Sequence, residues 1–422
     1  MLYTTKSSII VDVYIAILGR QPALGVAELE RVFGPKSIRV LSNQSVSIEC
    51  DDFEIQHFGG VPKAGKFVFE LQKSEWHHVS QKIAQYYYDK WSSIEGKITL
   101  GISAYGFQVN TREVQKTGII LKQKLKRSGV SLRLVPNLEP SLNSAVSHHN
   151  KLGLSQNKVE VLVIRTKDGK AVIAESTGSQ NITAYANRDQ MRPKRDAFIG
   201  MLPPKLAQIM INLACGQMAS GIWNMEYGEV STANSQTPIV KHQTILDPFC
   251  GTGVILQEAA LMDYSVYGTD LSEKMIRYSR DNLNWLAESH HVRSDCLLNV
   301  GDAMKTKWQQ PIDAVICETY LGQPFSAPPS PAKLDEVAQT CNHIITEFLK
   351  NIANQIKPGT PLCLAVPAWR DKNGKFTHLA HISTIARLGY KPHEFTNISQ
   401  NELLYFRENQ IVARELLVLT KT

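Results

Sequence analysis

The sequence predicts an α/β protein in which a doubly wound, mostly parallel sheet over residues 186–422 follows an α+β region over residues 1–185. Three observations predict this fold class. Strands and helices alternate after about residue 200, a glycine-rich turn joins the first of these strands to its helix, and the chain ends on two β-rich runs. Such alternation builds a parallel sheet that binds ligands at the carboxyl ends of its strands, and the two final runs predict an antiparallel hairpin at its edge.

The first 185 residues combine short apolar runs with three helical patterns, and we divide them into domains over residues 1–80 and 81–185. Asp168-Gly169 is a hairpin turn signal between the last two runs. Residues 177–200 are polar and basic and predict a linker. The predicted strands are Val11–Leu18, Val46–Glu49, Phe67–Leu71, Ile98–Ala104, Val159–Arg165 and Ala171–Ser176, and the predicted helices are Leu24–Phe33, Glu75–Trp91 and Arg112–Arg127.

The remaining residues predict the alternating sheet and helices of a third domain, over residues 186–422. The predicted strands are Ile245–Leu246, Ser265–Gly268, Ala314–Ile316, Leu362–Val366, Leu403–Phe406 and Glu415–Leu419, and the predicted helices are Val254–Leu261, Glu273–Leu286, Leu334–Ile356 and Thr377–Leu388.

The positive charge of the chain is concentrated in one segment. The net charge is +7, yet residues 101–200 alone hold 16 Lys and Arg against 7 Asp and Glu. Such a concentration is typical of proteins that bind a phosphate backbone, although a solvated helix face has the same appearance. The candidate RNA-binding residues form two clusters: Lys122, Lys124, Lys126 and Arg127, and Arg192, Lys194 and Arg195.

The composition excludes several other classes of protein. No apolar stretch approaches the roughly 18–20 residues that span a bilayer, and the N-terminal residues lack the pattern of a signal peptide. The seven cysteines are widely spaced and include no Cys-x-x-Cys pair, which argues against a disulfide framework or a metal site. The sequence therefore predicts a cytoplasmic protein with no membrane segment and no metal.

The strongest local motif is Asp247-Pro248-Phe249-Cys250-Gly251-Thr252-Gly253, in which a strand ends in an acid and two glycines precede a helix. The motif resembles the first motif of S-adenosylmethionine-dependent methyltransferases that modify exocyclic amines of nucleobases. Two later acids, Asp270 and Asp302, follow the next strand positions in the expected order. The resemblance implies that the cofactor-binding residues are Asp247, Pro248, Phe249, Gly251, Gly253, Asp270, Asp302 and Ala303.

The candidate catalytic residues are Glu318, Thr319 and Tyr320, which follow the strand Ala314–Ile316 where amino-methyltransferases carry Asp-Pro-Pro-Tyr. An aromatic amine is a poor nucleophile, so such a site needs acceptors for its N–H groups and an aromatic face for the base. By position, Glu318 supplies a carboxylate, Thr319 a backbone carbonyl and Tyr320 the stacking surface. The departure is that glutamate replaces aspartate and both prolines are absent.

Cys317, beside Glu318, allows a different reaction. A cysteine can attack C6 of a pyrimidine and so activate C5 for methylation, which requires an exposed thiolate. Because Cys317 continues an apolar strand, we expect it to be buried instead.

Taken together, the chain resembles the THUMP-domain tRNA guanine-N2 methyltransferases of archaeal and eukaryotic type, whose members methylate guanosine 10 of tRNA. The segments that carry the resemblance outside the motifs are 14–30, 192–196, 201–207 and 404–416. It implies a Rossmann-like class I methyltransferase domain behind a ferredoxin-like and THUMP-like RNA-binding region, with S-adenosylmethionine as cofactor and tRNA as partner. A DNA or other nucleobase amino-methyltransferase, a catalytically inactive RNA-binding relative and an accessory subunit remain open at this point.

Overall fold

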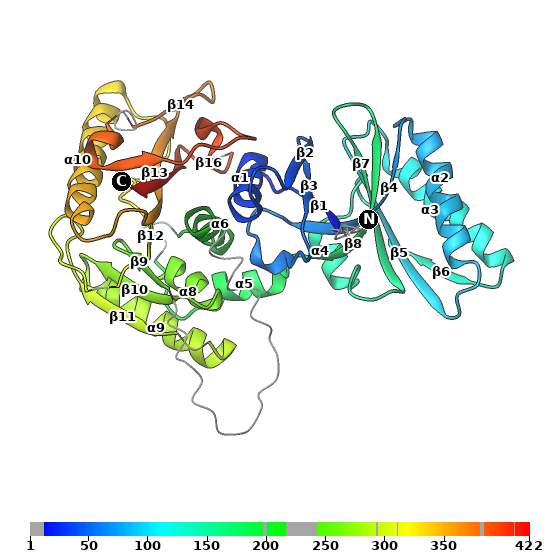
Figure 1. Ribbon diagram of the computed structural model, residues 1–422, viewed down its shortest axis with the longest axis horizontal. Coiled ribbons are helices and arrows are strands. Elements are labelled where there is room, and N and C mark those ends of the chain that lie inside the picture. Colours follow the sequence, from blue (N-terminus) through cyan, green and yellow to red (C-terminus); the bar gives the residue numbers. More distant parts are fainter. Residues whose placement is uncertain are drawn as a thin grey trace, which may run out of the picture. The chain divides into compact units, whose positions relative to one another are not determined.

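The computed structural model describes residues 12–196, 201–216 and 243–422, except for residues 293, 310, 380–383 and 409. The described chain divides into two compact units, where the sequence predicts three domains. Within the described ranges, unit 1 contains residues 12–22, 36–56 and 61–182, and unit 2 contains residues 23–35 and 57–60 and the described part of 183–422. Figure 1 shows the elements of both units, coloured along the chain.

Unit 1 is built on one mixed sheet of eight strands in the order β2-β3-β1-β4-β8-β7-β5-β6. This single sheet explains why residues 1–80 and 81–185 do not separate, since β4 and β8 pair antiparallel across the predicted boundary. The elements are β1 (Val13–Ile17), β2 (Ile38–Ser42), β3 (Ser45–Glu49), η1 (Ile55–His57), β4 (Lys63–Leu71), α2 (Trp76–Trp91), β5 (Lys97–Tyr105), α3 (Thr111–Arg127), β6 (Ser131–Leu134), α4 (Ser144–His149), β7 (Lys158–Arg165) and β8 (Ala171–Ser179).

Helices α2 and α3 lie side by side on one face of this sheet (Figure 1). Their apolar residues, such as Val79, Ile83 and Leu121, are fully buried against β5, β7 and β8. Helix α3 begins at a capping box, because Asn110 accepts a hydrogen bond from the Glu113 N–H and Glu113 accepts one from the Asn110 N–H. The packing of one face therefore leaves the opposite, basic face of α3 toward solvent.

Unit 2 is built on a sheet in the order β11-β10-β9-β12-β13-β17-β15, with β14 and β16 paired to its last strands. Strands β9 to β13 are parallel, and β17 runs antiparallel to β13. The prediction of a mostly parallel sheet closed by an antiparallel hairpin is confirmed. The strands are β9 (Thr244–Asp247), β10 (Ser265–Asp270), β11 (Cys296–Val300), β12 (Ala314–Glu318), β13 (Pro361–Arg370), β14 (Phe376–Thr377), β15 (Tyr390–Pro392), β16 (Leu404–Tyr405) and β17 (Val412–Lys421).

Among the described residues, the helices of unit 2 are α1 (Pro22–Phe33, of which Pro22 falls in unit 1), α5 (Ile182–Gln190, of which Ile182 falls in unit 1), α6 (Pro204–Cys215), α8 (Val254–Leu261), α9 (Glu273–His290), α10 (Pro331–Ala353), η3 (Ile385–Leu388) and η4 (Gln400–Glu402). Two predictions fail here. Helix α5 occupies part of the predicted linker, because Arg188 pairs with Glu258 of α8 at 2.7 Å and anchors it. The predicted helix Thr377–Leu388 is instead the end of β14, residues 380–383 outside the described ranges, and the short η3.

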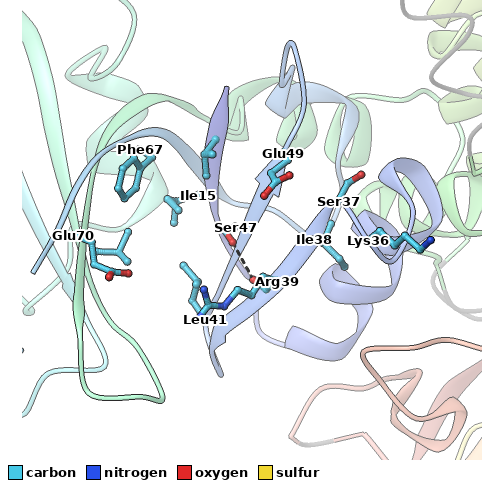
Figure 2. A pocket seen from close by; sticks show the side chains of 12 residues that line it. Ile15, Lys36, Ser37, Ile38, Arg39, Leu41, Ser47, Glu49, Phe67 and Glu70 are labelled. Carbon is cyan, nitrogen blue, oxygen red and sulfur yellow. Dashed lines mark hydrogen bonds between the residues drawn. The ribbon is translucent and has the colours of Figure 1, made fainter. Parts of the chain in front are cut away.

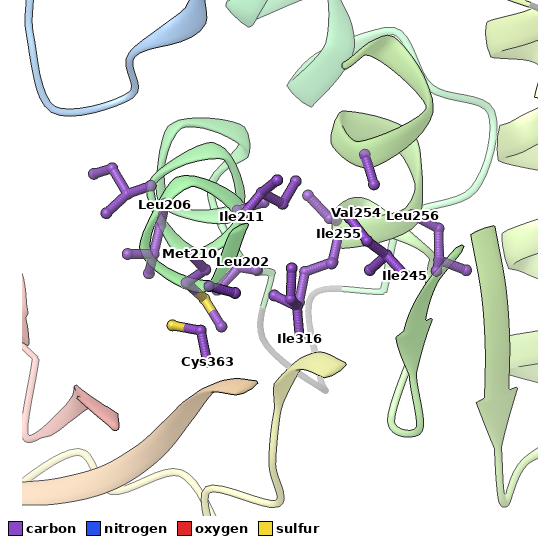
Figure 3. Close-up of a cluster of buried hydrophobic side chains, with 14 of the residues drawn as sticks. Leu202, Leu206, Met210, Ile211, Ile245, Val254, Ile255, Leu256, Ile316 and Cys363 are labelled. Carbon is purple, nitrogen blue, oxygen red and sulfur yellow. The ribbon is translucent and has the colours of Figure 1, made fainter. Parts of the chain in front are cut away.

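The sheet of unit 2 is covered on both faces. Helix α6 is buried along its length and packs with α8 on one face, where Figure 3 shows Met210 and Ile211 of α6 gathered with Ile255 of α8, Ile316 of β12 and Cys363 of β13. Helix α10 covers the other face through Phe348, Ile345 and their neighbours. This double cover fixes the strands, so that the carboxyl ends of β9, β10 and β12 form a rigid edge.

Helix α1 belongs to unit 2 although it lies in the first 35 residues. Both carboxylate oxygens of its buried Glu28 accept hydrogen bonds, from the N–H groups of Gly59 and Gly60 at 2.9 and 2.8 Å and from Asn212 of α6 at 2.7 Å. The neighbouring Arg31 donates to the carbonyls of Leu213 and Ala214, at the end of α6. Hydrogen bonds to the segment 57–60 and to α6 therefore hold α1 in unit 2.

Candidate functional site

The carboxyl ends of β9, β10 and β12 open into a cavity of about 710 Å³. Its wall includes Leu202, residues 247, 249–252 and 254–255 of the turn, Asp270, the segment 318–325, and residues 410–412 and 414 of the hairpin. The structure thus brings together four predicted cofactor-binding residues, Asp247, Phe249, Gly251 and Asp270, and all three predicted catalytic residues. A cavity of this size is typical of small-molecule and cofactor sites.

The glycine-rich turn is held in shape by Asp270. One carboxylate oxygen of Asp270 accepts the N–H of Gly251 at 2.9 Å, and the other accepts the N–H of Ser272 at 2.8 Å. Gly251 and Gly253 have positive φ angles of 50° and 81°, which glycine adopts without strain. A Cβ at Gly253 would lie 2.9 Å from the Ser279 hydroxyl oxygen, so this position requires glycine.

Asp247 is the most deeply buried acid of the site. It is 2% exposed and one carboxylate oxygen accepts the N–H of Phe249 at 3.1 Å. Burial, with Asp270 and Glu318 nearby, raises the pKa of Asp247 well above its usual value. A cationic ligand in the cavity would favour the ionised form of this carboxyl.

The remaining predicted cofactor residues lie outside the cavity wall. Gly253 and Pro248 belong to the glycine-rich turn but do not line the cavity, and Pro248 is buried. Asp302 accepts the N–H of Met304 at 3.0 Å, and the buried Ala303 accepts a hydrogen bond from Asn351 through its carbonyl. Asp302 and Ala303 therefore stay predictions as cofactor-binding residues.

Glu318 forms an ion pair that no sequence pattern revealed. It ends β12, and its Oε1 accepts a hydrogen bond from Nε of Arg414 on β17. The next residue is fixed as well, because both the N–H and the hydroxyl of Thr319 donate to the carbonyl of Ala365, at 3.0 and 3.1 Å. Tyr320 follows and is 45% exposed on the cavity wall.

Cys317 is turned away from this cavity. Its side chain is fully buried in the core between β12 and α10, and it is not part of the cavity wall. Burial raises the pKa of its thiol well above the usual value, and Asp247 and Glu318 raise it further. The structure therefore gives no support to a reaction in which Cys317 attacks a pyrimidine.

The predicted RNA-binding residues differ in exposure. Lys122, Lys126 and Arg127 are exposed on α3, and Lys124 donates to Gln85 of α2 at 3.1 Å. In the second cluster Arg195 is exposed, while Lys194 is held through its backbone by Asn282. Arg192 is only 3% exposed and lies 3.7 Å from Asp189, so its side chain is not presented as a surface contact.

A second hollow, of about 210 Å³, lies on the sheet of unit 1 (Figure 2). Its charged residues are of both signs, since the basic Lys36 and Arg39 line it together with the acidic Glu49 and Glu70. Glu70 is already paired with Lys170 at 2.8 Å. The cavity of unit 2 is therefore the candidate site, since it brings together predicted cofactor-binding and catalytic residues.

None of the described helices is long and apolar enough to cross a membrane. Among the described residues, no three His, Cys, Asp or Glu side chains gather as metal ligands do.

Comparisons with known proteins agree with this geometry. Residues 239–408 match the family model of a methyltransferase domain. The chain is 29% identical over 185 residues to the tRNA (guanine(10)-N2)-dimethyltransferase of Methanothermobacter thermautotrophicus, which covers 43% of this chain and 44% of the relative. It is 33% identical over 126 residues to the protein of the same name from Pyrococcus abyssi, which covers 30% of this chain and 26% of the relative. The matched segments thus span less than half of either relative.

The crystal structure of TrmN from Thermus thermophilus is similar over almost the whole chain. The similarity covers 97% of this chain and all of that one, with a TM-score of 0.50 and 16% sequence identity. At this identity the likeness shows the fold alone. Together with the family model, it establishes a Rossmann-like methyltransferase domain in unit 2, whose cofactor is S-adenosylmethionine.

The residues of the cavity fit this cofactor. Acidic side chains at the ends of β9 and β10 provide acceptors for ribose hydroxyls and a negative field for a cationic ligand, and the turn at Gly251 allows close approach of a ligand to the backbone.

Proposed function

We propose that this chain, in which residues 239–408 form a methyltransferase domain, transfers a methyl group from S-adenosylmethionine to the exocyclic N2 amine of a guanosine in tRNA. The observation that carries the proposal is the segment Glu318–Thr319–Tyr320, which lies at the carboxyl end of β12 in the same cavity as Asp247 and Asp270. The names of the two archaeal relatives support guanine N2 as the target and position 10 as its place in the tRNA.

The residues of the cavity supply what amine methylation needs. When bound, S-adenosylmethionine presents a methyl group on a sulfonium as the electrophile. Tyr320 offers an exposed aromatic face on which an extruded base stacks. Glu318 would accept a hydrogen bond from the amine and orient the nitrogen lone pair toward the methyl group that the cofactor would supply. The carboxylate of Glu318 then takes the proton that the amine loses.

Asp270→Ala is expected to weaken S-adenosylmethionine binding by about tenfold to a hundredfold. The substitution removes a charge-assisted acceptor for the ribose, worth about 1.5–3 kcal/mol, and also releases the N–H of Gly251. Isothermal titration calorimetry measures the effect, with Asp335→Ala, exposed on α10, as the control. An unchanged affinity in Asp270→Ala would show that the cofactor does not contact this strand end.

The basic face of α3 is expected to bind the phosphate backbone of tRNA. Replacing Lys122, Lys126 and Arg127 together by alanine should weaken tRNA binding and lower the slope of log Kd against log salt by about 0.7–0.9 for each phosphate that is no longer neutralised, because fewer counterions are released. A filter-binding series in salt measures the slope. The control replaces three exposed lysines of unit 2, Lys305, Lys307 and Lys357, by alanine. If both triple variants lose the same tRNA affinity, the attraction comes from the net charge of the chain and not from the basic face of α3.

The proposed activity is tested by incubating the full chain with labelled S-adenosylmethionine and transcribed tRNA, followed by nucleoside analysis. N2-methylguanosine or N2,N2-dimethylguanosine at a single position supports the proposal, and a variant transcript with adenosine there should stay unlabelled. Label in 5-methylpyrimidine or N6-methyladenosine would overturn it.

A further inference from the structure

Arg414 is the only basic residue among the described residues that line the cavity, where three acids also lie. It comes from β17, and its backbone is fixed on both sides, opposite Pro367 of β13 and Tyr405 of β16. The side chains of Arg414 and Glu318 are 8% and 18% exposed, so the pair is largely removed from water yet remains on the cavity wall.

Stability alone does not account for such a pair. Withdrawing two charges from water costs free energy that their attraction often fails to recover, and apolar residues of similar size are often as stabilising. What the pair does provide is a fixed carboxylate. Arg414 donates to Oε1, whereas Oε2 accepts no hydrogen bond from the described residues.

A carboxylate held by an arginine is an acceptor only, since it carries no proton to donate. Of the four RNA bases, guanine alone presents two adjacent donors on its Watson–Crick edge, at N1–H and at the N2 amine. Adenine and cytosine place a ring nitrogen lone pair beside their amine, and this lone pair would face the anion. A buried acceptor that meets another acceptor loses the hydrogen bond and pays for its desolvation.

We propose that Arg414 is a positioning residue that holds the carboxylate of Glu318 directed into the cavity, and that this carboxylate selects guanine by accepting hydrogen bonds from N1–H and from the N2 amine together. The inference rests on the proposed function and deepens it. It assigns a purpose to glutamate in place of the shorter aspartate, because the longer side chain of Glu318 reaches Arg414 on β17 while remaining on the cavity wall.

The test uses 2-aminopurine, which has the same C2 amine as guanine but a lone pair in place of N1–H. Two tRNAs are compared that differ only at the methylated position, which carries guanosine in one and 2-aminopurine in the other. For the wild-type chain, kcat/KM is expected to favour guanosine by at least a hundredfold. Glu318→Gln should reduce or reverse this ratio, because its amide N–H can donate to N1 of 2-aminopurine.

Arg414 variants separate positioning from a purely structural role. Arg414→Gln should lower kcat for guanosine and also lower the preference for guanosine over 2-aminopurine, while Arg414→Lys, which keeps a cation, restores part of both. Arg407→Gln, which changes an exposed arginine of the same hairpin, should leave the ratio unchanged. Calorimetry with S-adenosylmethionine checks that each variant keeps its cofactor affinity, and if Arg414→Gln fails to fold, the ratio measured for Glu318→Gln decides.

Two results would overturn the inference while leaving the proposed function in place: equal methylation of both tRNAs by the wild-type chain, or an unchanged preference in Glu318→Gln. A failure of the wild-type chain to form any N2-methylated guanosine on native tRNA would overturn the proposed function, and this inference with it.

Discussion

Glu318→Ala is expected to lower the rate of methyl transfer by a hundredfold or more at saturating tRNA and S-adenosylmethionine. The substitution removes the carboxylate that orients the amine, and loss of one transition-state acceptor in a dry site costs about 3–4 kcal/mol. The affinity for S-adenosylmethionine should change little, because Asp247 and Asp270 remain at the strand ends. Single-turnover kinetics with labelled cofactor measure the rate.

Glu318→Gln tests the role of the charge more directly than Glu318→Ala, since alanine also leaves Arg414 without its partner in the cavity wall. The amide retains one oxygen acceptor but loses the charge, so its rate should fall between those of the wild type and Glu318→Ala. Cys317→Ser serves as a neighbouring control and is expected to stay largely active, because its side chain lies outside the cavity wall. An active Glu318→Ala with an inactive Cys317→Ser would contradict the amine mechanism.

Glu28→Ala is expected to lower the free energy of unfolding of unit 2 by at least about 3 kcal/mol at mildly acidic pH. The substitution removes the carboxylate that accepts from the N–H groups of Gly59 and Gly60 in a buried site, and each lost acceptor costs about 1–3 kcal/mol. The amide of Asn212 loses one of its two acceptors and keeps the carbonyl of His57. Urea denaturation measures the loss. The exposed Glu288→Ala on α9 is the control and should change stability little.

The loss should also depend on pH. Burial raises the pKa of Glu28 from 4.5 to about 7, against the opposing effect of its hydrogen bonds. A carboxyl whose pKa is higher in the folded state contributes stability that is complete below pH 4.5 and is lost as the pH rises through 7. The difference between wild type and Glu28→Ala is therefore expected to shrink by about 2 kcal/mol between about pH 5.5 and about pH 8. A pH-independent difference would show that Glu28 is ionised throughout.

Local patterns were sufficient for most strands of the sheet of unit 2, but they did not predict β11 or β15. The strands β9, β10, β12 and β13 were predicted because each is a short apolar run between turn signals and helical spacing, which is information carried by neighbouring residues. The helix predicted over Thr377–Leu388 failed for the same reason, since helical spacing over a dozen residues does not reveal that β14 pairs with β13.

Partners distant in sequence could not be predicted in this way. Glu318 and Arg414 are 96 residues apart, and Glu28 and Asn212 are 184 residues apart. The only local signal for Arg414 was the presence of two charged residues, Arg414 and Glu415, within the otherwise apolar run Val412–Leu419. A charge in a run that is buried on both faces requires a partner, and the sequence does not say which one.

The place of α1 in unit 2 has a consequence for synthesis on the ribosome. The chain grows from its N-terminus at about 5–20 residues per second, so Glu28 is added to the chain roughly 10–40 seconds before Asn212. During that interval β1 and β3 can pair, while the helix joining β1 to β2 still lacks the amide and carbonyl groups of α6 that Glu28 and Arg31 bind. The polar side chains of α1 therefore lack their α6 partners until residues 204–215 have been made, and slow translation after residue 182 would prolong the exposure of α1.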